Sequence, residues 1–257
     1  KMFDTQRASI LKRVSAFLLD IILISVLATG FAWLISIIVN YDAHSDKLNE
    51  SYNAYYEAYG INSKLKEEEY NAMTDEEKAA YDQKLKAMEE AMQQDKELQK
   101  QFSQVVSLTL LMVSLGIFFA YIILEFAVPL ILKNGQTLGK KVFSLGVMRV
   151  DGVKATPFMM FVRTLLGKYT VETMIPIAII VLILFGSGGI IGITVLGMLT
   201  ILQIGLFVGT HNHTPIHDLF AQTVVVDLSS QIIFDTEAEM IEAKKQAAQA
   251  AAERKPY

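Results

Sequence analysis

The stretch LLDIILISVLATGFAWLISIIV, residues 18–39, is apolar almost throughout and holds one carboxylate, Asp20. Roughly 22 residues at 1.5 Å of rise each are enough to cross about 30 Å of hydrocarbon, so the stretch predicts a membrane-spanning helix. It is too long for a cleaved signal sequence, and no small-residue cleavage pattern follows it before the charged segment. We therefore expect an integral membrane protein.

Two further apolar blocks lie downstream of this stretch, and together they predict three more spans. Residues 105–132 form one span. The block at 175–208 is too long for a single span and contains Gly-Ser-Gly-Gly at 186–189, which predicts a turn between a third span at 171–185 and a fourth at 190–210. The predicted fold class is an all-α membrane protein with four transmembrane helices.

Lysine and arginine in the short flanks predict the orientation of these helices. Residues 1–13 carry four bases against one acid, and residues 133–168 carry seven bases against one acid, whereas the loop at 41–104 has fifteen acids against eight lysines. We expect both termini in the cytoplasm and the acidic loop outside the cell. The basic inner surface suits a lipid bilayer with anionic headgroups, and no nucleic acid partner is implied. The chain has no cysteine, which excludes disulfides and thiol chemistry.

The acidic loop at 41–104 predicts an exoplasmic helical insertion. Thr-Asp-Glu-Glu at 74–77 is a capping box, in which the threonine hydroxyl and Glu77 satisfy amides at the start of a helix. Residues 75–100 contain no Gly or Pro, and five tyrosines between 52 and 70 are expected to supply the other side of a helical hairpin that reverses near Gly60. The alternative is a flexible, solvated charged loop.

The loop after the second span predicts cytoplasmic interfacial helices and a small cytoplasmic β-hairpin. Residues 137–146 and 158–166 have the apolar and polar faces of short helices in the headgroup layer. Asp151-Gly152 indicates a two-residue hairpin turn within 147–155, to which residues 222–228 could add a third strand. The predicted segments are the lead-in and first span (1–40), the insertion (41–104), the second span (105–132), the basic loop (133–170), the third and fourth spans (171–210) and the cytoplasmic tail (211–257).

Ionisable residues inside a bilayer are costly unless they face protein or water, so each is a functional candidate. Three carboxylates fall within the predicted spans, namely Asp20, Glu125 and Glu172. Counted from the basic flanks, Asp20, Glu125 and Gln203 lie roughly 10–12 Å from the inner helix ends, and Glu172 lies about one turn closer. We therefore predict an ion or proton pathway through Asp20, Glu125, Gln203 and Glu172.

Several short motifs together resemble a known family. Arg13 is followed by Ala16, Phe17 and Asp20, NGQTLGKK stands at 134–141, Arg163 follows, and HDL stands at 217–219 with Ala221 and Thr223 after it. This pattern is similar to the RDD family of multi-pass bacterial membrane proteins, and the Arg and two Asp of that name would correspond to Arg13, Asp20 and Asp218. The resemblance implies a bacterial cell membrane and membrane transport, with cation/proton antiport suggested for some members.

Two functions are expected from these patterns. The first is a small transporter or cation/proton exchanger, formed by a homo-oligomer because four spans enclose little space, with Gly205 and Gly209 at the helix interface. The second is a non-transporting membrane adaptor or assembly factor, in which the insertion and the tail bind a partner membrane protein.

The charged residues of the resemblance also have a structural interpretation. Arg13, Arg163, Asp218 and His217 are expected to form a charge network near the inner ends of the spans. In a static version of this network, Asp20 joins the same ion pairs and only fixes the helix ends.

Two weaker motifs are not expected to be sites. GQTLGK at 135–140 has three residues between its glycines instead of the four of a phosphate loop, and no Ser or Thr follows its lysine. HNHTPIHD at 211–218 could place three imidazoles around a transition metal, but its spacing is not that of a known metal helix, and a turn is favoured. No catalytic constellation is evident, so we expect no metal, no cofactor and no enzymatic activity.

Overall fold

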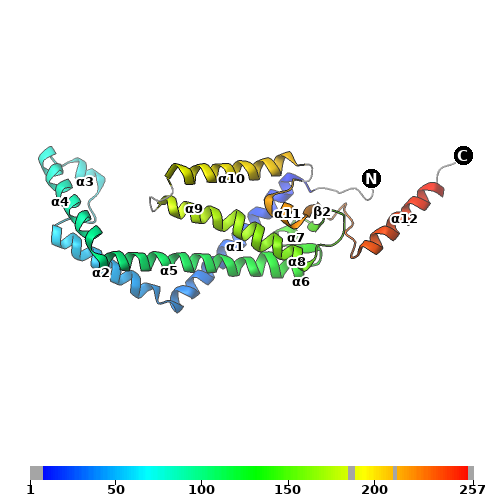
Figure 1. Ribbon diagram of the computed structural model, residues 1–257, viewed down its shortest axis with the longest axis horizontal. Helices are drawn as coiled ribbons and strands as arrows, with labels where there is room; N and C mark the ends of the chain where they lie inside the picture. Colours follow the sequence, from blue (N-terminus) through cyan, green and yellow to red (C-terminus); the bar gives the residue numbers. More distant parts are fainter. Residues whose placement is uncertain (1–7, 185–188, 211–212, 254–257) are drawn as a thin grey trace. The chain divides into compact units, whose positions relative to one another are not determined.

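The computed structural model describes residues 8–184, 189–210 and 213–253, which are mostly helical with one small two-stranded sheet. The chain divides into two compact units, which are described separately. The first unit, called here the charged unit, comprises Lys1–Ala28 and Ile117–Tyr257, and the second, called the insertion unit, comprises Thr29–Gly116. Figure 1 shows the helices of both units in sequence colours.

Within the described residues, four helical stretches are long and apolar enough to cross a membrane, which confirms the predicted number of spans. They are Ile10–Ile38, Lys96–Ile131, Pro157–Val181 and Gly189–Gly209. The first is α1 (Ile10–Ile38) and the fourth is α10 (Gly189–Gly209). The second joins α5 (Lys96–Tyr121), η1 (Ile122–Ala127) and α6 (Val128–Ile131), and the third joins α8 (Pro157–Phe161), η3 (Val162–Met174) and α9 (Ile175–Leu184).

The third span begins earlier than predicted. The segment expected as a separate interfacial helix at 158–166 is continuous with the span, because Thr156 caps a helix that no residue interrupts before Leu184. The Thr156 hydroxyl accepts a hydrogen bond from the Met159 amide at 3.2 Å, and Pro157 occupies the first turn, where its missing N–H is not needed. The predicted turn at 186–188 lies outside the described residues.

The two-stranded sheet differs from the predicted hairpin in its partner. β1 (Leu145–Arg149) pairs antiparallel with β2 (Thr223–Asp227), with Val147 opposite Val225. Asp151-Gly152 does form a turn, but the segment after it makes only an isolated bridge to β1, from Lys154 to Met148. The pairing of β1 with β2 is more stable than the predicted hairpin because both strands are buried over four residues. Each face of the sheet therefore covers an apolar cluster.

Short elements complete the charged unit. They are η2 (Lys133–Gly135), α7 (Leu138–Val142), α11 (Ile216–Ala221) and α12 (Glu237–Glu253). The predicted short helix at 137–146 is thus α7, with the first strand beginning at Leu145. Thr137 caps α7 by accepting a hydrogen bond from the Lys140 amide at 3.2 Å, so the sequence around NGQTLGKK forms a turn and one helical turn and a half.

The insertion unit is helical. Its helices are the last part of α1, α2 (Tyr41–Tyr59), α3 (Glu67–Asn71), α4 (Asp75–Gln94) and the first part of α5. Gly60 ends α2 in the left-handed region with φ 63°, where the chain reverses, and the capping box of Thr74 with Glu77 is present. Leu48, Met88 and Leu98 are buried between the helices and hold the unit together without disulfides.

Candidate functional site

A cavity of about 590 Å³ lies in the charged unit and collects most of its buried polar groups. Its walls are apolar side chains of α1 and α10, such as Phe17, Leu199 and Ile204. Polar side chains from several segments of the chain form much of the rest of the lining. The polar lining residues are Arg13, Asp20, Tyr121, Glu125, Lys140, Arg163, Lys168, Glu172, Thr173, Thr200, Gln203 and His217.

Two π-helical stretches, η1 and η3, carry much of this polar lining. In a π-helix the backbone bond joins residues five apart, so side chains with that spacing lie one above the other, and such stretches occur often at functional sites. Arg163, Lys168 and Thr173 of η3 have this spacing and all face the cavity. The Thr173 hydroxyl donates to the Lys168 carbonyl at 2.9 Å, which shows the five-residue step directly. The widened helix therefore lines up a guanidinium, an ammonium and a hydroxyl.

Glu125 and Lys168 form the shortest ion pair of the cavity. Lys168 Nζ lies 2.6 Å from Glu125 Oε2, and Glu125 is only 2 % exposed. Thr164 fixes the same helix turn by donating its hydroxyl to the Glu125 carbonyl at 2.8 Å. A charged pair at this depth is stable because each partner compensates the desolvation of the other, and removal of one leaves a buried charge.

Arg163 and Asp218 form a second buried pair, which Arg13 extends. Arg163 Nε donates to Asp218 Oδ1 at 2.7 Å, and Thr223 donates its hydroxyl to the same oxygen at 2.7 Å. Arg13 Nη2 lies 3.7 Å from Asp218 Oδ2, and its guanidinium stacks 5.1 Å above the centre of the Phe207 ring. Two guanidiniums thus share one carboxylate. Burial opposes the charged form of Asp218, but the neighbouring Arg163 outweighs it and holds the pKa of Asp218 below its ordinary value.

Two atoms of this pair stay unsatisfied. Within the described residues, Arg163 Nη1 and Asp218 Oδ2 have no hydrogen-bond partner, although both are buried. Buried polar atoms are almost always paired with protein or with bound molecules, so two unpaired atoms within one buried ion pair are unusual.

His217 joins this pair to Glu172. Its Nδ1 lies 2.8 Å from Glu172 Oε2, and its backbone amide donates to Glu172 Oε1 at 3.0 Å, while its Nε2 lies 3.1 Å from Arg163 Nη2. Burial lowers the pKa of His217, so the imidazole is neutral at pH 7. Gln203 also hydrogen-bonds Glu172 and accepts from the Ile216 amide at 3.2 Å. The close approach of η3 and α11 depends on Gly167, since a Cβ there would lie 2.5 Å from His217 Cβ.

Asp20 is held by α7 and not by an arginine. Thr137 donates its hydroxyl to Asp20 Oδ2 at 2.6 Å, and the Gly139 amide donates to Oδ1 at 2.8 Å. A Cβ at Gly139 would meet the Ala16 carbonyl at 2.3 Å, so glycine is needed for this contact. Lys140 Nζ lies 3.8 Å from Asp20 Oδ2, and burial lowers the pKa of Lys140 to about 8.

The structure brings the predicted pathway residues together and separates Asp20 from the predicted charge network. Asp20, Glu125, Gln203 and Glu172 all line the one cavity, at four different helices. Asp20 does not take part in the arginine network, contrary to the static interpretation, because the α7 amide and Thr137 hydroxyl occupy its oxygens.

Sequence reasoning missed Lys168 and Lys140, which were counted as basic flanks. The spacing of Lys168 from Arg163 would reveal their shared face only if a π-helix were expected, since five residues do not align on an α-helix. Lys140 has no comparable signal. It is buried only because Asp20 fixes α7 against α1.

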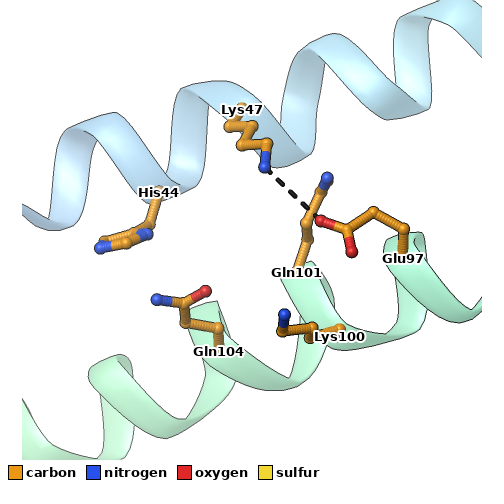
Figure 2. A pocket seen from close by; sticks show the side chains of 6 residues that line it. All are labelled: His44, Lys47, Glu97, Lys100, Gln101 and Gln104. Atoms are coloured by element: carbon orange, nitrogen blue, oxygen red, sulfur yellow. Dashed lines mark ion pairs between the residues drawn. The ribbon is translucent and has the colours of Figure 1, made fainter.

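The insertion unit has a smaller pocket of about 200 Å³. Figure 2 shows its six side chains, with His44 and Lys47 projecting from α2 and the others from α5, namely Glu97, Lys100, Gln101 and Gln104. Lys47 Nζ and Glu97 Oε1 are 3.5 Å apart, and both side chains are more than half exposed. Such a pair is weak and screened by salt, so the pocket has none of the buried chemistry of the first.

Comparison with known proteins gives one match. The model of the RDD family matches residues 7–222, which covers most of the chain and contains every polar lining residue of the larger cavity. No curated protein and no solved structure matches the chain. The tail helix α12 lies beyond the matched region.

Proposed function

The chain belongs to the RDD family, and from that premise we propose that it is a small cation/proton exchanger whose cavity in the charged unit binds the exchanged ions. Four helices long and apolar enough to cross a membrane make it a multi-pass membrane protein. A polar cavity at the level of such spans gives water or an ion a place away from hydrocarbon. The observation that carries the proposal is the Glu125–Lys168 pair at 2.6 Å on the cavity wall.

Glu125 is the proposed cation ligand, and the Lys168 ammonium competes with the cation for the Glu125 carboxylate. While the cation site is empty, the Lys168 ammonium neutralises Glu125. A monovalent metal cation takes the place of Lys168 as counter-ion when Lys168 gives up a proton, so the net charge of the cavity stays the same. One cation entering thus accompanies one proton leaving, which is an electroneutral exchange.

Glu172 and His217 are the proposed second titrating pair. The two side chains are hydrogen-bonded at 2.8 Å, and Gln203 holds the Glu172 carboxylate in place. Asp20 accepts its hydrogen bonds from a threonine hydroxyl and a backbone amide, so we assign it a positioning role in which it holds α7 and Lys140 at the cavity.

We further propose that the cavity lies near the cytoplasmic side and that both termini are cytoplasmic. The support is the excess of lysine and arginine in the segments that flank the cavity, since such segments stay inside. Fusing a reporter enzyme that is active only in the cytoplasm after residue 253 tests this, and a silent reporter would reverse the orientation.

Flux in reconstituted vesicles tests the exchange. A proton-sensitive dye inside vesicles should report proton movement when sodium or potassium is added outside, and Glu125→Gln should abolish it. Lys168→Gln should keep cation uptake but remove its dependence on pH. The matched control is Glu97→Gln, which removes the acid of the exposed Lys47–Glu97 pair and should leave flux unchanged.

The swapped variant Glu125→Lys with Lys168→Glu keeps the ion pair and shows whether the fold tolerates changes there. Absence of proton movement in the parent with either cation overturns the proposal.

A second candidate function is a membrane adaptor, favoured by the separate compact fold of the insertion unit. Its buried residues and capped helices give it a surface that does not depend on the cavity. Affinity purification of the full chain and of a variant without residues 45–100 tests this function. Loss of partners in the shortened chain supports it, and an unchanged partner set contradicts it. A chain without α12 tests separately whether the tail contributes to partner binding.

A further inference from the structure

We propose that the smaller pocket, in the insertion unit, binds the phosphate group of an anionic phospholipid. The pocket lies between α2 and α5 and has a volume of about 200 Å³. It holds several water molecules of roughly 30 Å³ each, so a phosphate group fits inside while the acyl chains stay outside. This binding goes beyond ion exchange and does not depend on it, because every lining residue belongs to the insertion unit.

Side-chain hydrogen bonds join α2 to α5 on both sides of the pocket. At one side the Thr109 hydroxyl donates to the Tyr41 hydroxyl at 3.1 Å, and at the other the Tyr55 hydroxyl donates to Asp95 Oδ2 at 2.9 Å. All six lining residues lie between these two contacts along the helices, where their side chains project from α2 and α5 as Figure 2 shows. The pocket is therefore a space between two helices that are joined above and below it.

The lining is richer in hydrogen-bond donors than in acceptors. Lys47 and Lys100 bring ammonium groups, and Gln104 brings an amide. His44 carries a ring N–H in either neutral tautomer. Among the six lining residues Glu97 is the only carboxylate, and its Oε1 lies 3.5 Å from Lys47 Nζ. Lys100 forms no ion pair with a described residue, so two ammonium groups face one carboxylate and the pocket favours an anion.

Gln101 holds a further donor in place before any ligand binds. Its side chain is buried, with 9 % exposed, and its Oε1 accepts a hydrogen bond from the Ser51 hydroxyl at 2.8 Å. The oxygen end of the amide is thereby engaged, and Nε2 remains for a ligand in the pocket. Phosphate oxygens only accept hydrogen bonds, and bonds from ammonium groups to them are strong. A donor that is already ordered lowers the entropic cost of such binding.

The pocket lies where two spans leave the hydrocarbon. α1 ends at Ile38, and His44 follows in the first turn of α2. On α5, Gln104 directly precedes the apolar run that begins at Val105. Trp33 and Ile38 near the end of α1 are 63 % and 81 % exposed, and such side chains face lipid at the edge of a membrane. A phosphate at this depth belongs to a lipid headgroup whose chains pass along α1.

The single tryptophan of the chain, Trp33, makes a local test possible. Brominated acyl chains quench tryptophan fluorescence on contact, so the purified full chain in detergent can be titrated with phosphatidylglycerol and with diacylglycerol that carry the same brominated chains. We expect half-maximal quenching at a concentration of phosphatidylglycerol at least about tenfold lower, because diacylglycerol lacks the charge-assisted hydrogen bonds. Coinciding curves overturn the proposal. Displacement of the lipid by an equal concentration of inorganic phosphate also overturns it, because the ligand would then be a free anion.

A matched pair of variants locates the site. Lys100→Gln should weaken the binding of phosphatidylglycerol about tenfold, and Lys100→Arg should keep it, since a guanidinium also binds phosphate. Lys96→Gln removes the same charge one turn earlier on α5, outside the lining, and should have no effect. Both lysines are exposed, so neither change threatens the fold.

Equal weakening by Lys96→Gln and Lys100→Gln would indicate a diffuse attraction between the helix and anionic lipid and would contradict a specific pocket. Ion flux through Lys100→Gln should match the parent, because Lys100 lies outside the charged unit. Loss of lipid binding with flux intact therefore concerns this pocket alone, and absence of flux in the parent with these lipid results intact counts only against the exchanger.

Discussion

The two units of the chain differ in whether their charged side chains are buried. In the charged unit, Arg163, Asp218 and Glu125 are each 2 % exposed or less, whereas among the described side chains of the insertion unit no Lys, Arg, Asp or Glu is buried. The insertion unit uses its acids to cap helices and to face water. The charged unit holds its acids and bases as compensated pairs. The candidate site is therefore distinguished by charged side chains that are buried together with an oppositely charged partner, and not by the number of charges.

The largest expected effect comes from breaking a buried pair. Asp218→Asn leaves two guanidiniums side by side without their carboxylate, so we expect a loss of about 3–5 kcal/mol of unfolding free energy. The matched change Asp227→Asn breaks the more exposed Lys12–Asp227 pair and should cost less than about 1 kcal/mol. Denaturation in detergent followed by circular dichroism measures both, and equal losses would contradict the contrast between buried and exposed charge.

The second-largest expected effect is a dependence of the unfolding free energy on pH, caused by Lys140. Its pKa is about 8 in the folded chain against 10.5 for the free group, because burial disfavours the ammonium. A base whose pKa falls on folding destabilises the fold while protonated, so the penalty of about 3 kcal/mol is present below pH 8 and disappears as the pH rises to 10.5.

Unfolding of the parent and of Lys140→Met at pH 7 and pH 10 checks this prediction. The parent should gain more stability with rising pH than the variant, and the exposed Lys141→Met should behave as the parent does. Parallel curves for the parent and Lys140→Met would show that Lys140 is not buried as a cation.

A smaller loss of stability is expected when a side chain is added where two helices approach closely. Gly167→Ala places a Cβ 2.5 Å from His217 Cβ, which must push η3 and α11 apart, and should cost about 1–3 kcal/mol. Gly197→Ala on α10 meets nothing within 4 Å, and should be neutral or slightly stabilising because alanine favours a helix. Thermal unfolding of the two variants compares them, and a harmless Gly167→Ala would remove the claim that this contact is tight.

The smallest expected effect is in the insertion unit. Thr74→Ala removes the side chain that accepts from the Glu77 amide, and should cost about 1 kcal/mol at the start of α4. Hydrogen exchange of the first amides of α4 measures this locally. Thr194→Ala, whose hydroxyl bonds within α10, is the control and should leave α4 exchange unchanged. Unaltered exchange in Thr74→Ala would mean that packing alone holds the helix.

Local patterns in the sequence predicted much of the fold. The spans follow from apolar runs, and the start of α4 follows from the Thr74–Glu77 capping box, because each signal lies within one segment. The pairing of β1 with β2 could not be predicted in the same way. Asp151-Gly152 is a strong local turn signal, but the buried partner strand lies more than seventy residues farther along the chain.

The candidate site was predictable in part for a related reason. Depth along each span predicted one level for Asp20, Glu125 and Gln203, with Glu172 about one turn closer to the inner end, since helical rise is regular. The partners of these acids depend on features that single-segment patterns do not show. Lys168 faces Glu125 because η3 is a π-helix, and the α7 amide reaches Asp20 because position 139 is glycine.

Access of water to the cavity tests the central claim most directly, and the chain has no cysteine to interfere. Single cysteines at Gln203 and Thr173, which line the cavity, and at Ile201, which does not, can be treated in vesicles with a charged thiol reagent that does not cross membranes. We predict that Gln203→Cys and Thr173→Cys react from one side only and that Ile201→Cys reacts from neither. Failure of both cavity positions to react from either side would contradict a water-filled cavity at the buried charges.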